Sequence, residues 1–280
     1  MESTRSRTRQ KAAARTYSTL LWHRLCLALG MTREDANVWP TVASGFGGAF
    51  LGIVVAHATV FVWSVRRAHD YSTRAQRFER PLADASRRIL IVGDSTAVGL
   101  GTLNGEDSIA GRLARDFPHA SIENRAVLGA RVACVLGQLA EPGGPFDAII
   151  IAAGGNDVIR GTPHERLRAA LTDVIQRARA LAPLVIVVNS GNVGGAPLFC
   201  WPLNMLLSRR SLRVRRVFAQ ACRQLRAQFV NLTFVPERDR FARQPGLYFA
   251  EDGLHPSSAA YEYCYEVLRR RTRLGRILAA

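Results

Sequence analysis

Three residues of the sequence supply the groups that serine-dependent acyl transfer requires. Ser95 lies in the run Gly93-Asp94-Ser95, and Asp252 precedes His255 by three residues. A serine hydroxyl is a weak nucleophile until a base takes its proton, and a neutral imidazole can do so near pH 7. A carboxylate that accepts a hydrogen bond from the other ring nitrogen fixes the tautomer of that base. We therefore expect Ser95 to be the nucleophile, His255 the base and Asp252 the residue that orients it.

The tetrahedral intermediate of such a reaction also needs hydrogen-bond donors for its oxyanion. The backbone N–H groups of Ser95 and Gly129 and the side-chain amide of Asn156 are the candidates. Gly129 ends a block that starts at Asn124, and Asn156 follows two glycines. A pre-positioned donor of this kind contributes about 3 to 4 kcal/mol to transition-state stabilisation. We expect Asp157, beside Asn156, to be a structural partner of the loop.

The elements that must position these residues are short apolar runs alternating with amphipathic segments. Strand, helix, strand repeated along the chain predicts a mostly parallel sheet with helices on both faces, whose strand ends meet at one edge. The predicted strands are residues 89–93, 121–124, 148–152, 184–189 and 232–235. The predicted helices are residues 108–116, 131–140, 163–181 and 209–229, and a last helix after His255. Every strand end carries a polar or glycine cluster, and only Ser190-Gly191-Asn192 receives no role.

The order and spacing of these clusters resemble the SGNH hydrolase family, also called GDSL esterases and lipases. The four signature residues of that family correspond to Ser95, Gly129, Asn156 and His255, with Asp252 as the acid of the triad. The resemblance implies a serine esterase or acylhydrolase that cleaves carboxylic esters through an acyl-enzyme intermediate. It implies no metal and no cofactor.

The resemblance covers roughly residues 88–268, with all four blocks in order. Thr96 stands where the GDSL name has leucine, which affects none of the expected roles. The implied fold is a three-layer α/β/α sandwich around a flavodoxin-like five-stranded parallel sheet. We assign residues 88–280 to this hydrolase domain and residues 1–87 to a basic, helical N-terminal anchor region.

Alternative functions differ in what they require of the sequence. Each cluster alone is typical of an ordinary turn or helix cap. The catalytic interpretation depends on all four clusters occurring in one consistent order, each after a predicted strand. A phosphate-binding loop is excluded because the glycines after Gly93 lack the GK[ST] ending. The α/β-hydrolase family is excluded because Ser95 does not lie in a G-x-S-x-G elbow. A catalytically silent, membrane-associated binding scaffold with the same fold is the second hypothesis. A nucleic-acid binder ranks last, because the arginines lie mostly on predicted helices and flanks.

Composition excludes two protein classes and points to a membrane. A chain of 280 residues with 48% hydrophobic residues is neither disordered nor a disulfide-dependent mini-protein, and its five cysteines have no CxxC spacing. The net charge of +16 suggests an anionic partner. Much of this positive charge lies in the segments on either side of residues 42–65. Within residues 42–65, His57 is the one strongly polar side chain. About 20 apolar helical residues cross a bilayer, so we predict a single-pass anchor.

This predicted anchor contains a stripe of small residues that would let two membrane helices pack and the protein self-associate. The stripe is Ser44, Gly48, Gly52 and Ala56. Both flanks of the segment are basic, so its orientation stays open. We expect association with a bacterial inner membrane, the alternative being a buried apolar helix of a cytoplasmic protein. Residues 17–31 fit a shorter interfacial helix.

An apolar stretch over residues 197–207 lies just after the fourth predicted strand. We expect its Phe199, Trp201 and Leu203 to contact the acyl chain of a substrate. A run of arginines, which could bind phosphate groups, follows this stretch directly. Those arginines are Arg209, Arg210, Arg213, Arg215 and Arg216. An apolar lip beside them suits a lipid or lysophospholipid substrate. The alternative is a core segment that leads into a helix with a solvated basic face.

Overall fold

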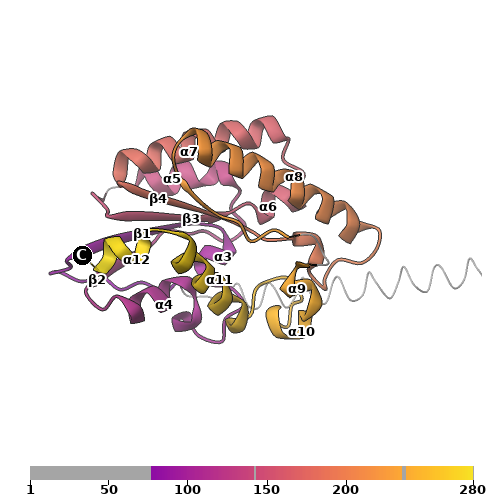
Figure 1. Ribbon diagram of the computed structural model, residues 1–280, viewed down its shortest axis with the longest axis horizontal. Helices are drawn as coiled ribbons and strands as arrows, with labels where there is room; N and C mark the ends of the chain where they lie inside the picture. The colour runs from indigo at the N-terminus through magenta and orange to yellow at the C-terminus, as the bar shows by residue number, and fades with distance from the viewer. Residues whose placement is uncertain (1–76, 142, 235–237, 280) are drawn as a thin grey trace, which may run out of the picture. The chain divides into compact units, whose positions relative to one another are not determined.

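The computed structural model of the chain describes residues 77–141, 143–234 and 238–279 (Figure 1). Its centre is a five-stranded sheet with the strand order β2-β1-β3-β4-β5, in which every neighbouring pair is parallel. The strands are β1 (Arg87–Gly93), β2 (Ala120–Asn124), β3 (Ala148–Ala153), β4 (Leu184–Asn189) and β5 (Gln228–Val230). This order confirms the predicted flavodoxin-like sheet.

The central strands are apolar along their whole length because both of their faces are covered. All residues of β3 and β4 are buried, whereas β2 at the sheet edge alternates between buried and partly exposed residues. The register pairs Ile91 with Asn124 and Gly93 with Ala152. The polar clusters that follow the strands therefore meet at one edge of the sheet.

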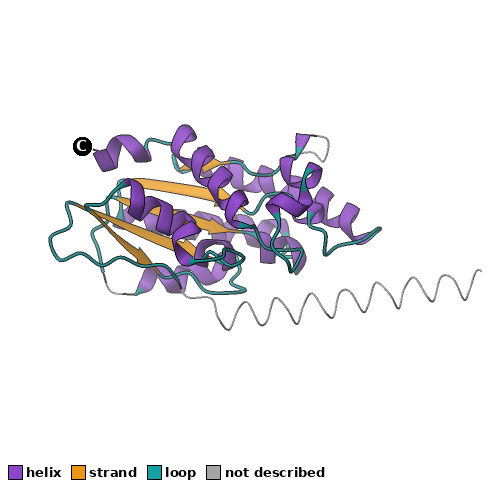
Figure 2. Ribbon diagram, turned by 90° about the horizontal axis from the view of Figure 1, so that it is seen from below, coloured by secondary structure: helices purple, strands orange, loops and turns teal. Residues whose placement is uncertain are grey.

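Two layers of helices cover the sheet (Figure 1). One layer consists of α5 (Val135–Ala140), α7 (His164–Leu181) and α8 (Leu203–Gln224). The other, which is nearer the viewer in Figure 2, consists of α4 (Ile109–Asp116), α11 (Ser258–Arg271) and α12 (Leu274–Ala279). Alternate β1 residues serve the two layers: Leu90 packs with the first cluster of core residues and Ile89 with the second. The predicted three-layer sandwich is confirmed.

Short helices occupy the loops at the carboxyl edge of the sheet. They are α3 (Ser95–Val98), α6 (Gly155–Ile159), α9 (Arg240–Arg243) and α10 (Pro245–Tyr248). Three 3₁₀ turns, Gly105–Asp107, Val132–Cys134 and Val193–Gly195, complete these connections. Two of the short helices, α3 and α6, directly follow strands that the sequence analysis connects with chemistry.

The fifth strand was predicted too late in the chain. The sequence favours residues 232–235, but Gln228–Val230 forms the ladder with β4. The chain then turns away, because Leu232 N donates to the side chain of Asn189 (2.7 Å) and Thr233 Oγ1 donates to Gly191 O (2.9 Å). The predicted helix over residues 209–229 is shifted for the same reason, since α8 begins at Leu203 and ends before the strand.

The packed structure extends to residues before position 88. Arg80 forms an antiparallel bridge with Ile122 of β2, with N···O distances of 2.9 Å in both directions. Its guanidinium donates to the carbonyls of Ala114, Phe117 and Ala120. A chain that started at residue 88 would leave these three carbonyls without that donor.

The predicted membrane anchor at residues 42–65, with its Ser44, Gly48, Gly52 and Ala56 stripe, lies outside the described residues. The interfacial helix over residues 17–31 does so too. Within the described ranges, every helix is too short or too polar to cross a bilayer.

Candidate active site

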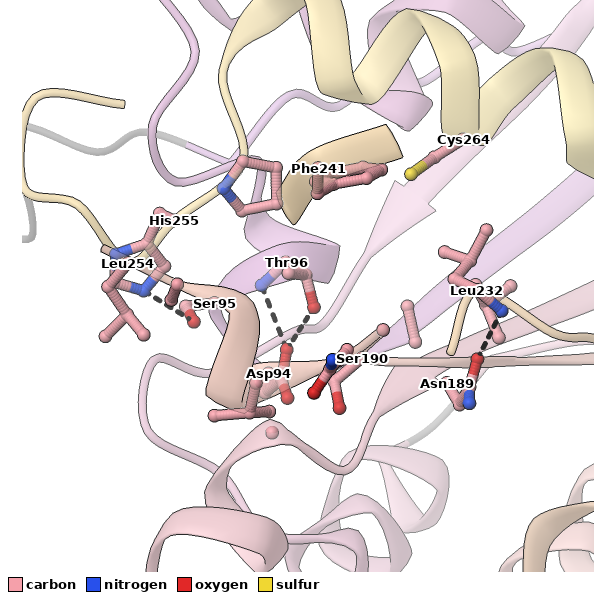
Figure 3. Close-up of a pocket in the computed structure, with 18 of the residues that line it drawn as sticks. Asp94, Ser95, Thr96, Asn189, Ser190, Leu232, Phe241, Leu254, His255 and Cys264 are labelled. Carbon is pink, nitrogen blue, oxygen red and sulfur yellow. Dashed lines mark hydrogen bonds between the residues drawn. The ribbon is translucent and has the colours of Figure 1, made fainter. Parts of the chain in front are cut away.

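Ser95, His255 and Asp252 form a continuous chain of hydrogen bonds at the carboxyl edge of the sheet. His255 Nε2 lies 3.1 Å from Ser95 Oγ, and His255 Nδ1 lies 2.5 Å from Asp252 Oδ2 (Figure 3 shows the first contact). The side chain of His255 is 12% exposed and that of Asp252 is 1% exposed. The structure thus brings together three predicted residues in an arrangement that can move a proton from the hydroxyl to the imidazole.

The backbone around Ser95 explains why its hydroxyl projects from the end of β1. Gly93 has φ +145°, and a Cβ there would lie 1.8 Å from Ala152 O, so only glycine fits. Asp94 then caps α3 by accepting hydrogen bonds from the backbone N–H (2.9 Å) and the hydroxyl of Thr96. Ser95 is therefore the first residue of a helix that starts directly beside the neighbouring strand.

Burial and hydrogen bonding act in opposite directions on the carboxyl group of Asp252. Burial by itself raises its pKa, but hydrogen bonds from the His255 ring and from the N–H groups of His255 (3.0 Å) and Leu254 (2.9 Å) outweigh it. The pKa of Asp252 therefore lies below its usual value, and the group is a carboxylate at neutral pH. A carboxylate in this position accepts a hydrogen bond from His255 Nδ1 and so fixes the orientation of the ring.

The three predicted oxyanion donors lie in neighbouring loops. The N–H groups of Ser95 and Gly129 donate no hydrogen bond within the described chain, and Gly129 has φ +72°. Asn156 lines the same pocket as Ser95 and donates one amide proton to Ala130 O (3.1 Å). Its second amide proton is left for a ligand. Gly129 is not among the pocket-lining residues, but it precedes the residue that Asn156 holds.

Two supporting residues and one predicted partner stabilise these loops. Gln138 accepts from Gly93 N (2.7 Å) and donates to Gly93 O (2.9 Å), so it clamps the end of β1. Asn124 donates to Ala97 O (3.0 Å) in α3. Neither role was predicted from the sequence, although the position of Asn124 at the end of a strand was a usable signal. Asp157 accepts from the backbone N–H at position 132 (2.9 Å), as expected of a loop partner.

A pocket of about 120 Å³ extends inward from Ser95 and His255. In Figure 3, these residues lie at one end, Asp94 and Ser190 near the middle, and Leu232 and Cys264 at the other end. Burial raises the pKa of Asp94, although hydrogen bonds from Thr96 and Gly155 partly oppose this effect. Burial likewise raises the pKa of the Cys264 thiol to about 12. The described residues include no cluster of three His, Cys, Asp or Glu side chains that could hold a metal ion.

The predicted substrate contacts Phe199, Trp201 and Leu203 lie outside this pocket. Phe199 is a core residue at 8% exposure, whereas Trp201 (74%) and Leu203 (43%) are on the surface. None of the three lines the pocket, because the stretch turns away from it and runs into the first turn of α8. The stretch still supports the site, since Leu198 N donates to Gly253 O (3.0 Å) in the loop between Asp252 and His255.

Known proteins with similar sequences and folds are ester hydrolases. A GDSL-like esterase from Mycobacterium tuberculosis is 27% identical over 244 residues, covering 79% of this chain and 77% of its own length. An extracellular lipase from Streptomyces rimosus has the same fold (TM-score 0.51, 17% identity, covering 67% of this chain and all of its own). So has a catalytic mutant of an acetylxylan esterase from Geobacillus stearothermophilus (TM-score 0.51, 18% identity, covering 67% and 94%).

A family model gives the same assignment from sequence alone. The model described as the GDSL-like Lipase/Acylhydrolase family matches residues 91–263, a range that contains Ser95, Gly129, Asn156, Asp252 and His255. The predicted resemblance is confirmed. The chain therefore belongs to the GDSL-like lipase/acylhydrolase family and is an ester hydrolase.

Proposed function

We propose that the protein cleaves carboxylic esters through a Ser95-His255-Asp252 triad and an acyl-enzyme intermediate. The observation that carries this proposal is the hydrogen-bonded chain from Ser95 Oγ through His255 to the buried carboxylate of Asp252. Its geometry satisfies the requirements for an activated nucleophile, with the base oriented by a third group. The mechanism needs no metal or cofactor.

In the acylation step, Ser95 Oγ attacks the ester carbonyl while its proton passes to His255 Nε2. Asp252 stabilises the imidazolium that forms. The imidazolium then gives its proton to the alkoxide as the ester C–O bond breaks. The alcohol departs, and the acyl group stays bonded to Ser95 Oγ. In the second half of the reaction, water attacks the acyl-enzyme while His255 takes one of its protons. The bond to Ser95 Oγ then breaks, His255 returns the proton to Ser95 Oγ, and the carboxylic acid is released.

We propose that three hydrogen-bond donors bind the oxyanion of both tetrahedral intermediates. These are the N–H groups of Ser95 and Gly129 and the free amide proton of Asn156. The hydrogen bond from Asn156 to Ala130 O supports this assignment, because it fixes the amide beside the Gly129 loop before substrate arrives. Donors held in place in this way need no reorganisation during the reaction.

The triad is tested with the full chain, its Ser95→Ala variant and 4-nitrophenyl butanoate. We expect hydrolysis by the wild type and its loss in the variant, together with fluorophosphonate labelling of the wild type at Ser95. Ser86→Ala is the matched control, because Ser86 is exposed and lies outside the pocket. Equal rates for Ser95→Ala and wild type, or no labelling, would favour the alternative of a catalytically silent scaffold.

A second proposal concerns a lipid surface as the place where substrate is met. The stretch that bonds to the loop of Asp252 and His255 through Leu198 continues into surface-exposed Trp201, Leu203, Met205 and Leu206. On α8, Arg209, Arg213 and Arg216 follow Leu206 at helical spacing and are exposed. Apolar side chains beside a basic stripe suit an anionic membrane surface and a lipid or lysophospholipid ester. The anchor at residues 42–65 stays a separate prediction.

This lipid-surface proposal is tested with the triple variant Arg209→Gln, Arg213→Gln and Arg216→Gln. Arg210 is kept, because its guanidinium donates to Thr162 O. Each basic residue near an anionic surface contributes about 1 kcal/mol, so hydrolysis of a lysophospholipid in phosphatidylglycerol vesicles should fall roughly 100-fold. Hydrolysis of soluble 4-nitrophenyl butanoate should not change. An unchanged rate on the vesicles would contradict the proposal.

A further inference from the structure

The cluster after β4, to which the sequence analysis assigns no role, contributes an unusual residue to the pocket. Asn192 is 8% exposed and lines the pocket together with Ser95 and His255. Neither its Oδ1 nor its Nδ2 has a hydrogen-bond partner among the described residues. An unpaired buried polar group costs about 1 to 3 kcal/mol, so both atoms of this amide require a partner that enters the pocket.

Asn189, three residues earlier, lines the same pocket, and both of its side-chain polar atoms are bonded to protein. Its Oδ1 accepts from Leu232 N (2.7 Å), as drawn in Figure 3, and its Nδ2 donates to Thr233 Oγ1 (2.6 Å). The two asparagines are both buried on the same strand end. The missing partners of Asn192 are therefore a property of that position and not of the region.

The surroundings of Asn192 favour a neutral ligand group. No lysine or arginine lines the pocket, while Asp94 and Asp239 do, so a carboxylate or phosphate would meet carboxyl groups without a cation. A Cβ built on Gly195 would lie 3.7 Å from both Asn192 Nδ2 and Asp239 Oδ2, so the amide and this carboxyl both lie close to Gly195. A primary amide offers N–H donors and an acceptor oxygen, and a hydroxyl group can pair with one donor and with the acceptor.

We propose that Asn192 is a specificity-determining residue that binds a hydroxyl group of the ester substrate, with Nδ2 donating to the hydroxyl oxygen and Oδ1 accepting its proton. The inference rests on the proposed ester hydrolysis at Ser95 and names the substrate class. The pocket of about 120 Å³ is smaller than a cavity of roughly 150 Å³ that holds benzene. The group that enters is therefore short, and the hydroxyl belongs either to a short acyl chain or to a short alcohol.

Two pairs of esters, matched in shape, test this inference on the full chain. For the acyl side, 4-nitrophenyl 3-hydroxybutanoate is compared with 4-nitrophenyl 3-methylbutanoate. For the alcohol side, 3-hydroxypropyl butanoate is compared with butyl butanoate. The wild type should prefer the hydroxyl ester by at least about tenfold in kcat/KM within one pair, because its apolar counterpart leaves the amide unpaired. The pair that shows the preference identifies the source of the hydroxyl.

The residue is tested with Asn192→Leu, which removes donor and acceptor at similar size. In this variant, the kcat/KM of the hydroxyl ester divided by that of its apolar counterpart should fall to about one or below. Asn104→Leu is the control, because Asn104 is exposed and outside the pocket, and it should keep the wild-type preference. If Asn192→Leu fails to fold by circular dichroism, Asn192→Asp replaces it. That substitution keeps the shape and removes the donor, so it should also reduce the preference.

The outcomes separate this inference from the proposed function. Failure of the Ser95 mechanism would appear as no Ser95-dependent hydrolysis of any of the four esters. Failure of the inference would appear as hydrolysis of all four with wild-type ratios near one in both pairs, or as a preference that survives in the Asn192 variants. Either of the last two results would show that Asn192 does not select a hydroxyl group of the substrate.

Discussion

The two sides of the pocket handle their polar groups in opposite ways. On the reaction side, Ser95, His255 and Asp252 bond to one another in an unbroken chain. On the wall at the end of β4, Oδ1 and Nδ2 of Asn189 are each bonded to protein, whereas neither atom of Asn192 has a partner among the described residues. Paired groups set the geometry before substrate arrives, whereas an unpaired buried group gains its partner from the ligand. The comparison therefore separates residues that shape the site from residues that choose what enters it.

The largest expected effect tests whether the reaction side works as one unit. Ser95→Ala and His255→Ala should each lower kcat by roughly 10⁶-fold, and the double variant should be little worse than either alone. Such non-additivity follows because the base has no function without its nucleophile. The measurement is kcat on 4-nitrophenyl butanoate. Additive losses would mean that the two residues act independently.

A smaller effect is expected for the oxyanion donor. Asn156→Ala should lower kcat about 10²- to 10³-fold and change KM little, because the free amide proton is used in the transition state. Steady-state kinetics separate the two parameters. Asn156→Asp is the companion variant, since it keeps the shape but places a carboxylate where the oxyanion would form. A loss confined to KM would remove Asn156 from the oxyanion site.

Stability measurements sharpen the contrast between the two asparagines of the β4 wall. Asn189→Ala should lower the free energy of unfolding by about 2 to 4 kcal/mol, because it leaves Leu232 N without its acceptor and removes the donor to Thr233 Oγ1. Asn192→Ala should cost less, since it breaks no hydrogen bond within the protein. Urea unfolding of both variants checks this order. Equal losses would show that Asn192 is as much a structural residue as Asn189.

The smallest expected effect is the pH dependence of stability due to Asp252. Its pKa is lower in the folded chain than its ordinary value of about 3.9, so the unfolded chain binds more protons between the two values. The stabilisation is present above the ordinary pKa and is lost as the pH falls through the folded one. The difference in unfolding free energy between wild type and Asp252→Asn should thus narrow from pH 5 to pH 3. A constant difference would contradict the lowered pKa.

Much of the fold was predictable because strand and helix periods are local properties. The first four strands lie within two residues of their predicted bounds. The polar clusters expected after the first and the fifth strand predicted that Ser95 and His255 are neighbours. The fifth strand was misplaced because residues 228–230 and 232–235 are both short apolar candidates. The ladder with β4 and the side chain of Asn189 decide between them, and neither contact has a local signal.

The apolar stretch after β4 illustrates what a local pattern leaves open. Phe199, Trp201 and Leu203 are alike in the sequence, yet one is in the core and two are on the surface. Which side chain is buried depends on α8 and on the loop at Gly253, to which the stretch is bonded. The same dependence on distant segments hid the clamp that Gln138 forms on Gly93.

The sequence by itself determined the chemistry, since the types and order of residues at the strand ends specify a nucleophile, a base and an acid in a GDSL-type ester hydrolase. Only the tertiary structure decided which residues line the pocket beside Ser95 and which of their polar groups lack a partner. Asn192 is one asparagine among several until the fold buries it in a pocket that α11, the segment after β5 and Asp239 also line. Burial by segments far apart in the chain, and the hydrogen bonds they do or do not supply, distinguish a binding residue from an ordinary loop residue.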